Sequence, residues 1–298
     1  MTAPDRDGGL FVGVDFGGTT VTAGAVENGE LRTLATVPTL RDRPPGEILE
    51  TIAVLIDETA QNRPIAGIGV GVPCPAGPGT DRLVMIENIP SMEGYPFRTL
   101  LEERCSTPVA LENDANCMAY GEHRAGALRG CLHCACLTLG TGLGCGIVIE
   151  GRLYRGAGNY AGEIWNIPWA DGRTLEDRVS IAGLQALYRD ATGETVEPEA
   201  LHERYLAGDP EAVDAFERFG ESVGQVAVML ISTLDPERIA LGGGLSRAFD
   251  AFAGGMSRTV GRTWGTDGAG RIVRAELSGR AAVLGAAALA AEHFRPGV

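Results

Sequence analysis

Short apolar runs alternate with turn residues through the first part of the chain. Residues 10–16, 20–26 and 32–37 are short and apolar, and Asn28-Gly29 lies between the second and third runs, as in a hairpin turn. The stretch 44-PPGEILETIAVLIDETAQ-61 instead places apolar residues at helical spacing, with Pro45 in the first turn. The next stretch, 65-IAGIGVGVP-73, is typical of a buried strand that ends at a proline. Three strands, a helix and a strand predict an α/β half.

The second part of the chain repeats this organisation loosely. Residues 131–149 are apolar on both sides of 139-LGTGLGCG-146, and 147-IVIEGRLYRG-156 indicates a hairpin around Glu150-Gly151. A long amphipathic helix is predicted over 211–236, with Val213 on its apolar face, followed by a strand that breaks at glycines in 238-RIALGGGLS-246. We therefore predict a duplicated α/β fold with a cleft between two domains. The expected domains are 1–112, joined by a C-terminal helix at 281–298, and 113–280.

Composition narrows the possible functions. The formal net charge of -14 and a pI near 4.8 disfavour any protein that grips nucleic acid through its backbone charge. All 25 basic residues are arginine, which excludes a P-loop lysine and a lysine Schiff base. The 43 glycines are not periodic, and we expect them at tight turns and where the backbone approaches a ligand.

The cysteines and the N-terminus indicate a cytoplasmic protein. The opening MTAPDRDGGL has no apolar signal core, and the 7 cysteines are an odd number, which favours free thiols in a reducing compartment. In 131-CLHCAC-136, Cys134 and Cys136 would share one face of a strand. Core packing is favoured over a zinc site for Cys131, Cys134 and Cys136, because no second ligand pair follows at zinc spacing.

Two glycine turns are suited to phosphate. In 15-DFGGTT-20, Asp15 can hold hydrated Mg²⁺, Gly17 and Gly18 can bring backbone N–H groups to an anion, and Thr19 and Thr20 add hydroxyl donors. The loop 140-GTGLG-144, with Thr141 and Gly142, can clasp phosphate in the same way. Taken alone, the first turn favours a plain hairpin with a solvated Asp15, and the second is a weak signal, because a glycine-rich hairpin needs no ligand.

A third loop carries a candidate base. In 109-VALENDANCMAYGEH-123 a strand runs into Glu112-Asn113-Asp114, and a helix is expected from Ala115. Asp114 then lies at a helix N-terminus, where it is either a simple N-cap or a general base that takes a proton from a substrate hydroxyl. Phosphoryl transfer to an alcohol needs such a base together with glycine loops and Mg²⁺, and their joint occurrence favours the second interpretation.

In their order along the chain, these motifs resemble those of the ROK family of sugar kinases, within the actin/hexokinase superfamily. The resemblance covers most of the chain. It rests on Val14-Asp15-Phe16-Gly17-Gly18-Thr19, Gly71-Val72-Pro73 with Pro75, Asn113-Asp114-Ala115-Asn116, Leu139-Gly140-Thr141-Gly142-Leu143-Gly144, Ala161-Gly162-Glu163-Ile164, Leu241-Gly242-Gly243-Gly244-Leu245-Ser246 and Gly285-Ala286-Ala287.

The resemblance implies a two-domain, actin/hexokinase-like (ribonuclease H-like, duplicated) fold and an ATP- and Mg²⁺-dependent kinase that works as a homodimer. It implies that Asp114 is the base and that Asp15 holds Mg²⁺ through water. The implied sugar-binding residues are Asn88, Asn113, Asp114, Glu163, Asn166 and Glu176. The implied nucleotide-binding residues are Asp15, Gly17, Gly18, Thr19, Thr20, Thr141, Gly142, Gly243 and Gly244.

Departures from the family pattern cluster where the sugar would bind. Trp165-Asn166 stands where the family has Gly-His, and 167-IPWADGR-173 has neither Cys nor His, so we expect a shortened loop without zinc. Cys74 replaces a glycine, and Thr20 replaces a frequent lysine. Glu176, in 174-TLEDRVS-180, fits the second sugar-contacting position, although a plain helix-terminal carboxylate is an alternative.

The favoured function is therefore phosphorylation of a hexose, as in a glucokinase, at the 6-hydroxyl. An N-acetylhexosamine (GlcNAc or ManNAc), allose or fructose are alternative acceptors, and polyphosphate is a donor disfavoured by the acidic charge and the absence of lysine. A sugar-responsive repressor is disfavoured because only about ten residues precede Val12. A sugar-binding protein that has lost catalysis is disfavoured because Asp15, Asp114 and the glycine loops are all present. We expect no nucleic-acid or membrane partner.

Overall fold

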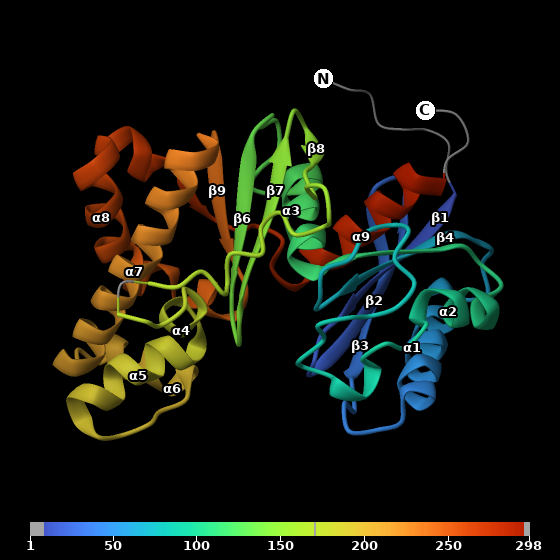
Figure 1. Cartoon of the computed structure of the whole chain (residues 1–298), viewed down its shortest axis with the longest axis horizontal. Helices are drawn as coiled ribbons and strands as arrows, with labels where there is room; N and C mark the ends of the chain where they lie inside the picture. Colours follow the sequence, from blue (N-terminus) through green and yellow to red (C-terminus); the bar gives the residue numbers. More distant parts are fainter. Residues whose placement is uncertain (1–8, 170, 295–298) are drawn as a thin grey trace. The chain divides into compact units, whose positions relative to one another are not determined.

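The computed structural model of the chain describes residues 9–169 and 171–294 (Figure 1). The strands are β1 Leu10–Phe16, β2 Thr20–Glu27, β3 Glu30–Pro38, β4 Ile65–Val72, β5 Val109–Asn113, β6 Cys134–Leu139, β7 Leu143–Ile149, β8 Arg152–Leu153, β9 Arg238–Gly242 and β10 Ile272–Arg274. The helices are α1 Pro45–Ala60, α2 Phe97–Cys105, α3 Asp114–Ala125, α4 Glu176–Val179, α5 Ile181–Thr192, α6 Pro198–Leu206, α7 Pro210–Leu234, α8 Phe249–Gly270 and α9 Ala281–Phe294. Short 3₁₀ turns are η1 Pro90–Met92, η2 Gly244–Ala248 and η3 Ser278–Arg280.

The chain divides into two compact units. Of the described residues, unit 1 contains 9–126, Leu153–Ala161 and 279–294, and unit 2 contains Ala127–Arg152 and those between Gly162 and Ser278. Both α3 and α9 thus belong to unit 1. The domain limits 1–112 and 113–280 remain a prediction, and residues 295–298 of the expected C-terminal helix lie outside the described residues.

Among the described helices, none combines the length and the apolarity needed to cross a bilayer.

The two units carry sheets of the same topology. Sheet 1 has the order β3-β2-β1-β4-β5, and sheet 2, read from the other end, has the order β8-β7-β6-β9-β10. In each, the first strand of the unit pairs antiparallel with the next strand along the chain and parallel with a later one: β1 with β2 and β4, β6 with β7 and β9. The duplicated α/β fold predicted from the sequence is therefore confirmed.

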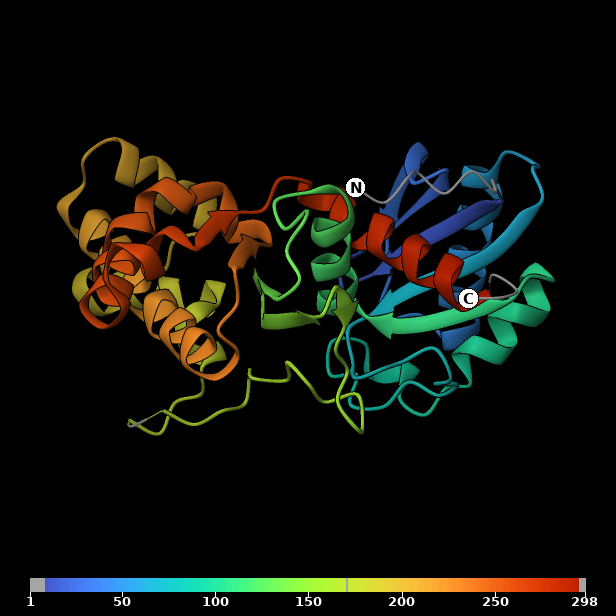
Figure 2. The same ribbon diagram turned by 90° about the horizontal axis from the view of Figure 1, so that it is seen from above.

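Sheet 1 is covered on both faces, which explains its almost continuous apolar strands. Val12 and Phe16 of β1 belong to a buried cluster with α1 and α2, whereas Phe11, on the opposite face, packs with Ala287 and Ala290 of α9. The alternation follows from the two-residue period of a strand. Figure 2 shows α9, in red, lying along the strands of sheet 1.

Glycines allow α9 to lie against backbone rather than against side chains. A Cβ at Gly13 of β1 would stand 1.9 Å from the Val283 carbonyl oxygen, and one at Gly285 would stand 1.8 Å from the Cys117 carbonyl oxygen of α3. Gly69 of β4 is similarly placed, 2.0 Å from the carbonyl oxygen of Ala286. Real Cβ atoms do not make such contacts, so the position of α9 on sheet 1 and α3 requires glycine at these sites.

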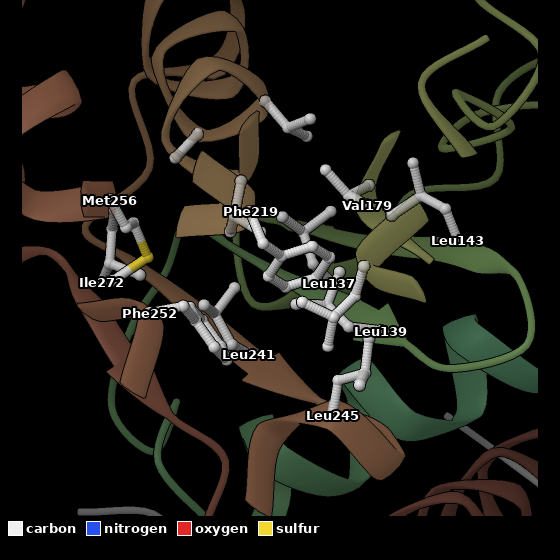
Figure 3. Close-up of a cluster of buried hydrophobic side chains, with 14 of the residues drawn as sticks. Leu137, Leu139, Leu143, Val179, Phe219, Leu241, Leu245, Phe252, Met256 and Ile272 are labelled. Atoms are coloured by element: carbon white, nitrogen blue, oxygen red, sulfur yellow. The ribbon is translucent and has the colours of Figure 1, made fainter. Parts of the chain in front are cut away.

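Unit 2 has its own apolar core between sheet 2 and the helices α4 to α8. Figure 3 shows Leu137 and Leu139 of β6 and Leu241 of β9 packed near Phe219 of α7 and Phe252 of α8. Cys134 and Cys136 of β6 are buried, as expected for core packing. The seven cysteines are free thiols, and Cys105 alone among them is half-buried rather than buried.

One expectation for the long helix is wrong. Asp209 caps α7 by accepting hydrogen bonds from the N–H groups of Glu211 and Ala212, and most of the apolar face is buried. Val213, however, is 42% exposed. It lies at the edge of the apolar stripe and in the first turn, where neighbouring elements leave that edge uncovered.

The contact between α7 and α8 again depends on glycine. A Cβ at Gly255 of α8 would stand 2.2 Å from the Glu217 carbonyl oxygen of α7, and one at Gly220 of α7 would stand 2.1 Å from the Phe252 carbonyl oxygen. The high glycine content therefore serves close helix packing in both units, and the sequence-based expectation of turns and ligand contacts covered only part of it.

Two glycines of the same helix give a matched test. Gly255→Ala should lower the free energy of unfolding by about 3 kcal/mol, because its methyl group overlaps the α7 backbone. Gly261→Ala should raise it by about 0.5–1 kcal/mol, because alanine is the better helix former and no atom lies within 4 Å of the new Cβ. Urea unfolding of both variants checks this, and equal effects would contradict the packing argument.

Candidate functional site

Three parallel strands of sheet 1 end at the same edge and carry the acidic candidates there. In register, Asp15 of β1 lies opposite Gly71 of β4, and Gly71 lies opposite Glu112 of β5. Asp114 follows β5 directly, and a Cβ at Gly71 would stand 3.4 Å from the Asp114 Cα. Carboxyl ends of parallel strands are the usual place for ligands in such sheets. The structure thus brings Asp15 and Asp114 to one edge of unit 1.

The surroundings of Asp15 disfavour its charged form. It is half-buried, no cationic side chain of the described ranges pairs with it, and burial raises its pKa from 3.8 to about 6. Desolvation disfavours the charged form, and a bound cation would reverse this effect. Carboxylate oxygen is a preferred ligand of Mg²⁺, so the residue fits that ion.

In the turn after Asp15, one of the two glycine N–H groups predicted to bind an anion is hydrogen-bonded within the turn. The N–H of Gly17 donates to the Thr20 carbonyl oxygen at 3.0 Å, which closes the hairpin, so Gly17 does not present that group to an anion. Thr39 holds the turn from the side, since its hydroxyl donates to the Gly17 carbonyl oxygen at 2.6 Å. Gly18 and Thr19 make no N–H hydrogen bond to another described residue.

Asn88 lies against this turn. A Cβ at Gly18 would stand 3.0 Å from the Cβ of Asn88, so the two segments approach closely at this glycine. The Asn88 side chain is exposed. The structure therefore places a predicted sugar-binding residue beside a predicted phosphate-binding turn within unit 1.

The cap of α3 is Asn113 and not Asp114. Asn113 Oδ1 accepts from the Asn116 N–H at 3.1 Å, and Asn113 Nδ2 donates to the Cys74 carbonyl oxygen at 3.4 Å. Asp114 is the first helical residue, and its Oδ1 accepts from the Ala115 N–H at 2.7 Å. The interpretation of Asp114 as a simple N-cap is therefore wrong. Its carboxylate still lies at the positive end of the helix.

Glu112 is a buried carboxylate that sequence reasoning did not single out. Only 3% of it is exposed, and it accepts from the Asn113 N–H at 3.0 Å, Asn116 Nδ2 at 2.9 Å and Arg155 Nε at 2.5 Å. Burial raises its pKa, and the Arg155 guanidinium opposes that shift. Glu112 thereby fixes both asparagines that flank Asp114. A glutamate at the end of an apolar strand was the available signal, but nothing in the sequence linked it to Arg155.

In unit 2, Glu176 is bonded to the second glycine loop. The loop joins β6 to β7, and the Leu143 N–H donates to Glu176 Oε2 at 2.9 Å. A Cβ at Gly142 would stand 2.6 Å from the same oxygen. Thr141, at the tip, is exposed. Glu176 is also the first residue of α4, so the helix-terminal position and the loop contact occur together.

The glycines after β9 lie beside the start of that loop. Gly243 has φ +80°, and a Cβ there would stand 2.3 Å from the Leu139 carbonyl oxygen, so only glycine fits. Gly244 begins η2 and has open space around its Cα. Thr141, Gly142, Glu176 and Gly243 are thus brought together at one end of sheet 2.

Glu163 stands on a tight turn against β7. Gly162 has φ +89°, and a Cβ there would stand 2.0 Å from the Cys145 carbonyl oxygen. Burial raises the pKa of the half-buried Glu163, and a hydrogen bond from Trp165 Nε1 to Glu163 Oε2, 2.8 Å long, opposes the shift. Asn166 is exposed. Sequence reasoning marked Trp165 as a departure from the family pattern and did not predict its bond to Glu163.

The segment after Asn166 is held by charge and ring contacts. Pro168 and Thr174 form a β-bridge, Asp171 pairs with Arg173 at 2.9 Å, and Arg178 pairs with Asp171 at 2.7 Å. The Arg178 guanidinium lies over the Trp169 ring, 5.3 Å from its centroid. Ala170 lies outside the described residues. Within the described ranges, no three His, Cys, Asp or Glu side chains form a group able to hold a metal.

Comparison with known proteins gives a consistent result. The family model described as ROK family matches residues 11–293. A glucokinase of Streptomyces coelicolor is 30% identical over 316 residues, covering 95% of this chain and 98% of that protein. An N-acetyl-D-glucosamine kinase of Vibrio vulnificus is 34% identical over 259 residues, covering 80% of this chain and 84% of that kinase.

One solved structure supports the fold. The crystal structure of a ROK family glucokinase from Streptomyces griseus, in complex with glucose and AMPPNP, matches with a TM-score of 0.83 at 29% identity. The match covers 95% of this chain and 100% of that chain. Together with the duplicated sheets, this confirms the actin/hexokinase-like α/β fold predicted from the sequence.

The raised pKa of Asp15 predicts a pH-dependent stability. Because the folded pKa of about 6 exceeds 3.8, the carboxyl group favours folding at pH values below 3.8, and this contribution is lost as the pH rises through about 6. Asp15→Asn should equal the wild type near pH 4 and exceed its free energy of unfolding at pH 7 by at most about 3 kcal/mol. Urea unfolding across this pH range measures the difference. Asp42→Asn, at an exposed aspartate, is the control, and a pH-independent difference for Asp15→Asn would contradict the argument.

Proposed function

Because the chain belongs to the ROK family, we propose that it is an ATP- and Mg²⁺-dependent kinase that phosphorylates a hexose hydroxyl, in the manner of a glucokinase. The observation that carries the proposal is the placing of Asp15 and Asp114 at one carboxyl edge of sheet 1. One carboxylate lacks a cation, and the other lies at a helix N-terminus beside it. Cation binding and proton transfer are the two tasks that phosphoryl transfer to an alcohol requires.

Asp114 acts as the general base. Its carboxylate accepts the proton of the sugar hydroxyl while that oxygen attacks the γ-phosphorus of ATP, and the bond from this phosphorus to the ADP oxygen breaks. Asn113 and Glu112 act as positioning residues, because they cap the helix and fix the segment that carries Asp114. Asp15 would hold Mg²⁺ through water, and that ion would neutralise phosphate charge when bound.

Backbone groups bind the nucleotide. In unit 1, the Gly18 and Thr19 N–H groups and the hydroxyls of Thr19 and Thr20 bind phosphate oxygens, and Gly17 shapes the turn. In unit 2, Thr141 and Gly142 bind phosphate, and Gly243 and Gly244 bind the adenosine side. Rigid donors of this kind cost no reorganisation when charge moves in the transition state.

Polar side chains bind the sugar hydroxyls. The proposed ligands are Asn88, Asn113, Asp114, Glu163, Asn166 and Glu176. Because Glu176 Oε2 already accepts from Leu143, its other oxygen is the one available to a hydroxyl. Glucose is the favoured acceptor, with an N-acetylhexosamine, allose or fructose as alternatives. We further propose a cytoplasmic homodimer.

The base is tested by Asp114→Asn. Since the amide cannot take the proton, kcat should fall by about 100-fold or more, while KM for ATP changes little. ADP release in a coupled assay measures both constants, and circular dichroism checks the fold. Asp190→Asn, at an exposed aspartate on α5, should keep wild-type kinetics. A fully active Asp114→Asn variant would overturn this assignment.

The acceptor is tested with a panel of hexoses and amino sugars in the presence of ATP and Mg²⁺. Glucose should release ADP with the highest kcat/KM, and GlcNAc, ManNAc, allose and fructose with lower values. Sugar binding measured by calorimetry separates a kinase from a binding protein. If a sugar binds but no sugar releases ADP, the chain is a non-catalytic sugar-binding protein and the proposed function is wrong.

A further inference from the structure

Trp165 contacts two of the carboxylate residues that the proposed function assigns to the sugar. Its indole Nε1–H donates to Glu163 Oε2 at 2.8 Å. Its backbone carbonyl oxygen accepts from the Glu176 N–H at 3.1 Å. Resting on that function, we propose that Trp165 is a positioning residue whose indole N–H holds the Glu163 carboxylate in the orientation that binds a sugar hydroxyl.

Contacts of neighbouring residues fix the backbone around Glu163, so only the conformation of its side chain can vary. Gly162 is held against the Cys145 carbonyl oxygen of β7, and the Ile164 N–H donates to the Gly162 carbonyl oxygen at 2.7 Å. A glutamate side chain on a fixed backbone still has three rotatable bonds. The hydrogen bond from the indole N–H selects among these rotamers. Trp165 is itself anchored, since its ring packs against the apolar core of unit 2.

A neutral donor suits a carboxylate that must also bind substrate. Within residues 9–169 and 171–294, no arginine or histidine pairs with Glu163. The Cys145 thiol on β7 interacts electrostatically with Glu163, and it is not cationic. The indole occupies one acceptor site of Oε2, so Oε1 remains available to sugar hydroxyls. A guanidinium would have occupied both oxygens.

The backbone contact links this pair to the glycine loop. Glu176, whose N–H donates to Trp165, accepts from Leu143 through Oε2, so residues 163, 165, 176 and 143 form a continuous chain of hydrogen bonds. A substitution that displaced the Trp165 backbone would therefore disturb two assigned regions together. Trp165→Phe avoids this, because it keeps an aromatic ring and the backbone and removes only the N–H donor.

The first experiment compares Trp165→Phe with Trp169→Phe, a matched control in the same segment whose ring stacks on Arg178. For Trp165→Phe, KM for the sugar should rise about 10-fold, because a hydrogen bond to a charged group is lost, while kcat and KM for ATP stay within about twofold. Loss of the donor also raises the pKa of Glu163, so the acid limb of kcat/KM for the sugar should move to higher pH. Trp169→Phe should change neither quantity.

Wild-type sugar KM together with a wild-type pH profile in Trp165→Phe would overturn the inference. A change in kcat alone, with no shift of the acid limb, would also overturn it, because that pattern indicates a structural role. Absence of sugar phosphorylation by the wild type would instead contradict the proposed function, and the second experiment would still test Trp165.

The second experiment does not depend on activity or on a substitution at Trp165. The sequence contains 3 tryptophans, so the double variant Trp169→Phe, Trp264→Phe leaves Trp165 as the single emitter. Its fluorescence should change with pH as the Glu163 carboxylate titrates, at a pH above the usual pKa range of a glutamate. Adding Glu163→Gln should abolish this change. Emission that is independent of pH, or a titration that survives Glu163→Gln, would overturn the inference.

Discussion

Direct contact between backbones, made possible by glycine, is the constraint on which unit 1 depends. Helix α9 lies against β1, β4 and α3 at a separation where a single methyl group would overlap a carbonyl oxygen. Because these contacts involve no long side chains, they leave little freedom for the elements to slide. The strands that end at Asp15 and Glu112 and the helix that begins at Asp114 are therefore fixed relative to one another. The relative positions of Asp15, Glu112 and Asp114 therefore depend on the packing of α9 against β1, β4 and α3.

The surroundings compensate the charge of one carboxylate at this edge and leave the other without a partner among the described residues. Glu112 is almost fully buried but is compensated by Arg155 and by two asparagine donors. Asp15 is half-buried without such a partner, and desolvation raises its pKa to about 6. A buried charge that is left uncompensated costs stability, and such costs concentrate at functional positions. The contrast separates Glu112, which is compensated by its neighbours, from Asp15, which fits the cation-binding role proposed for it.

Strong local patterns predicted most of the fold. The strands around residues 10–38, helix α1, strand β4 and the hairpin at Glu150-Gly151 follow from period, proline and turn residues, and the structure confirms them. The ordered glycine motifs also indicated the family. What could not be predicted depends on contacts between distant residues. Glu112 with Arg155, Asn113 in place of Asp114 as the cap, and Trp165 with Glu163 are each decided by tertiary placement. Val213 was misjudged because amphipathic period does not reveal where covering elements end.

The equal topology of the two sheets allows their positions to be compared one by one. Asp15 is the penultimate residue of β1, opposite Thr22 of the antiparallel neighbour and Gly71 of the parallel one. The same place in sheet 2 is Thr138 of β6, opposite Gly144 and Gly242. The two sheets thus share one strand order but differ at this corresponding position, where sheet 1 has a carboxylate and sheet 2 a neutral hydroxyl. The proposed binding of a cation therefore belongs to sheet 1, because Asp15, and not Thr138, offers a carboxylate at this position.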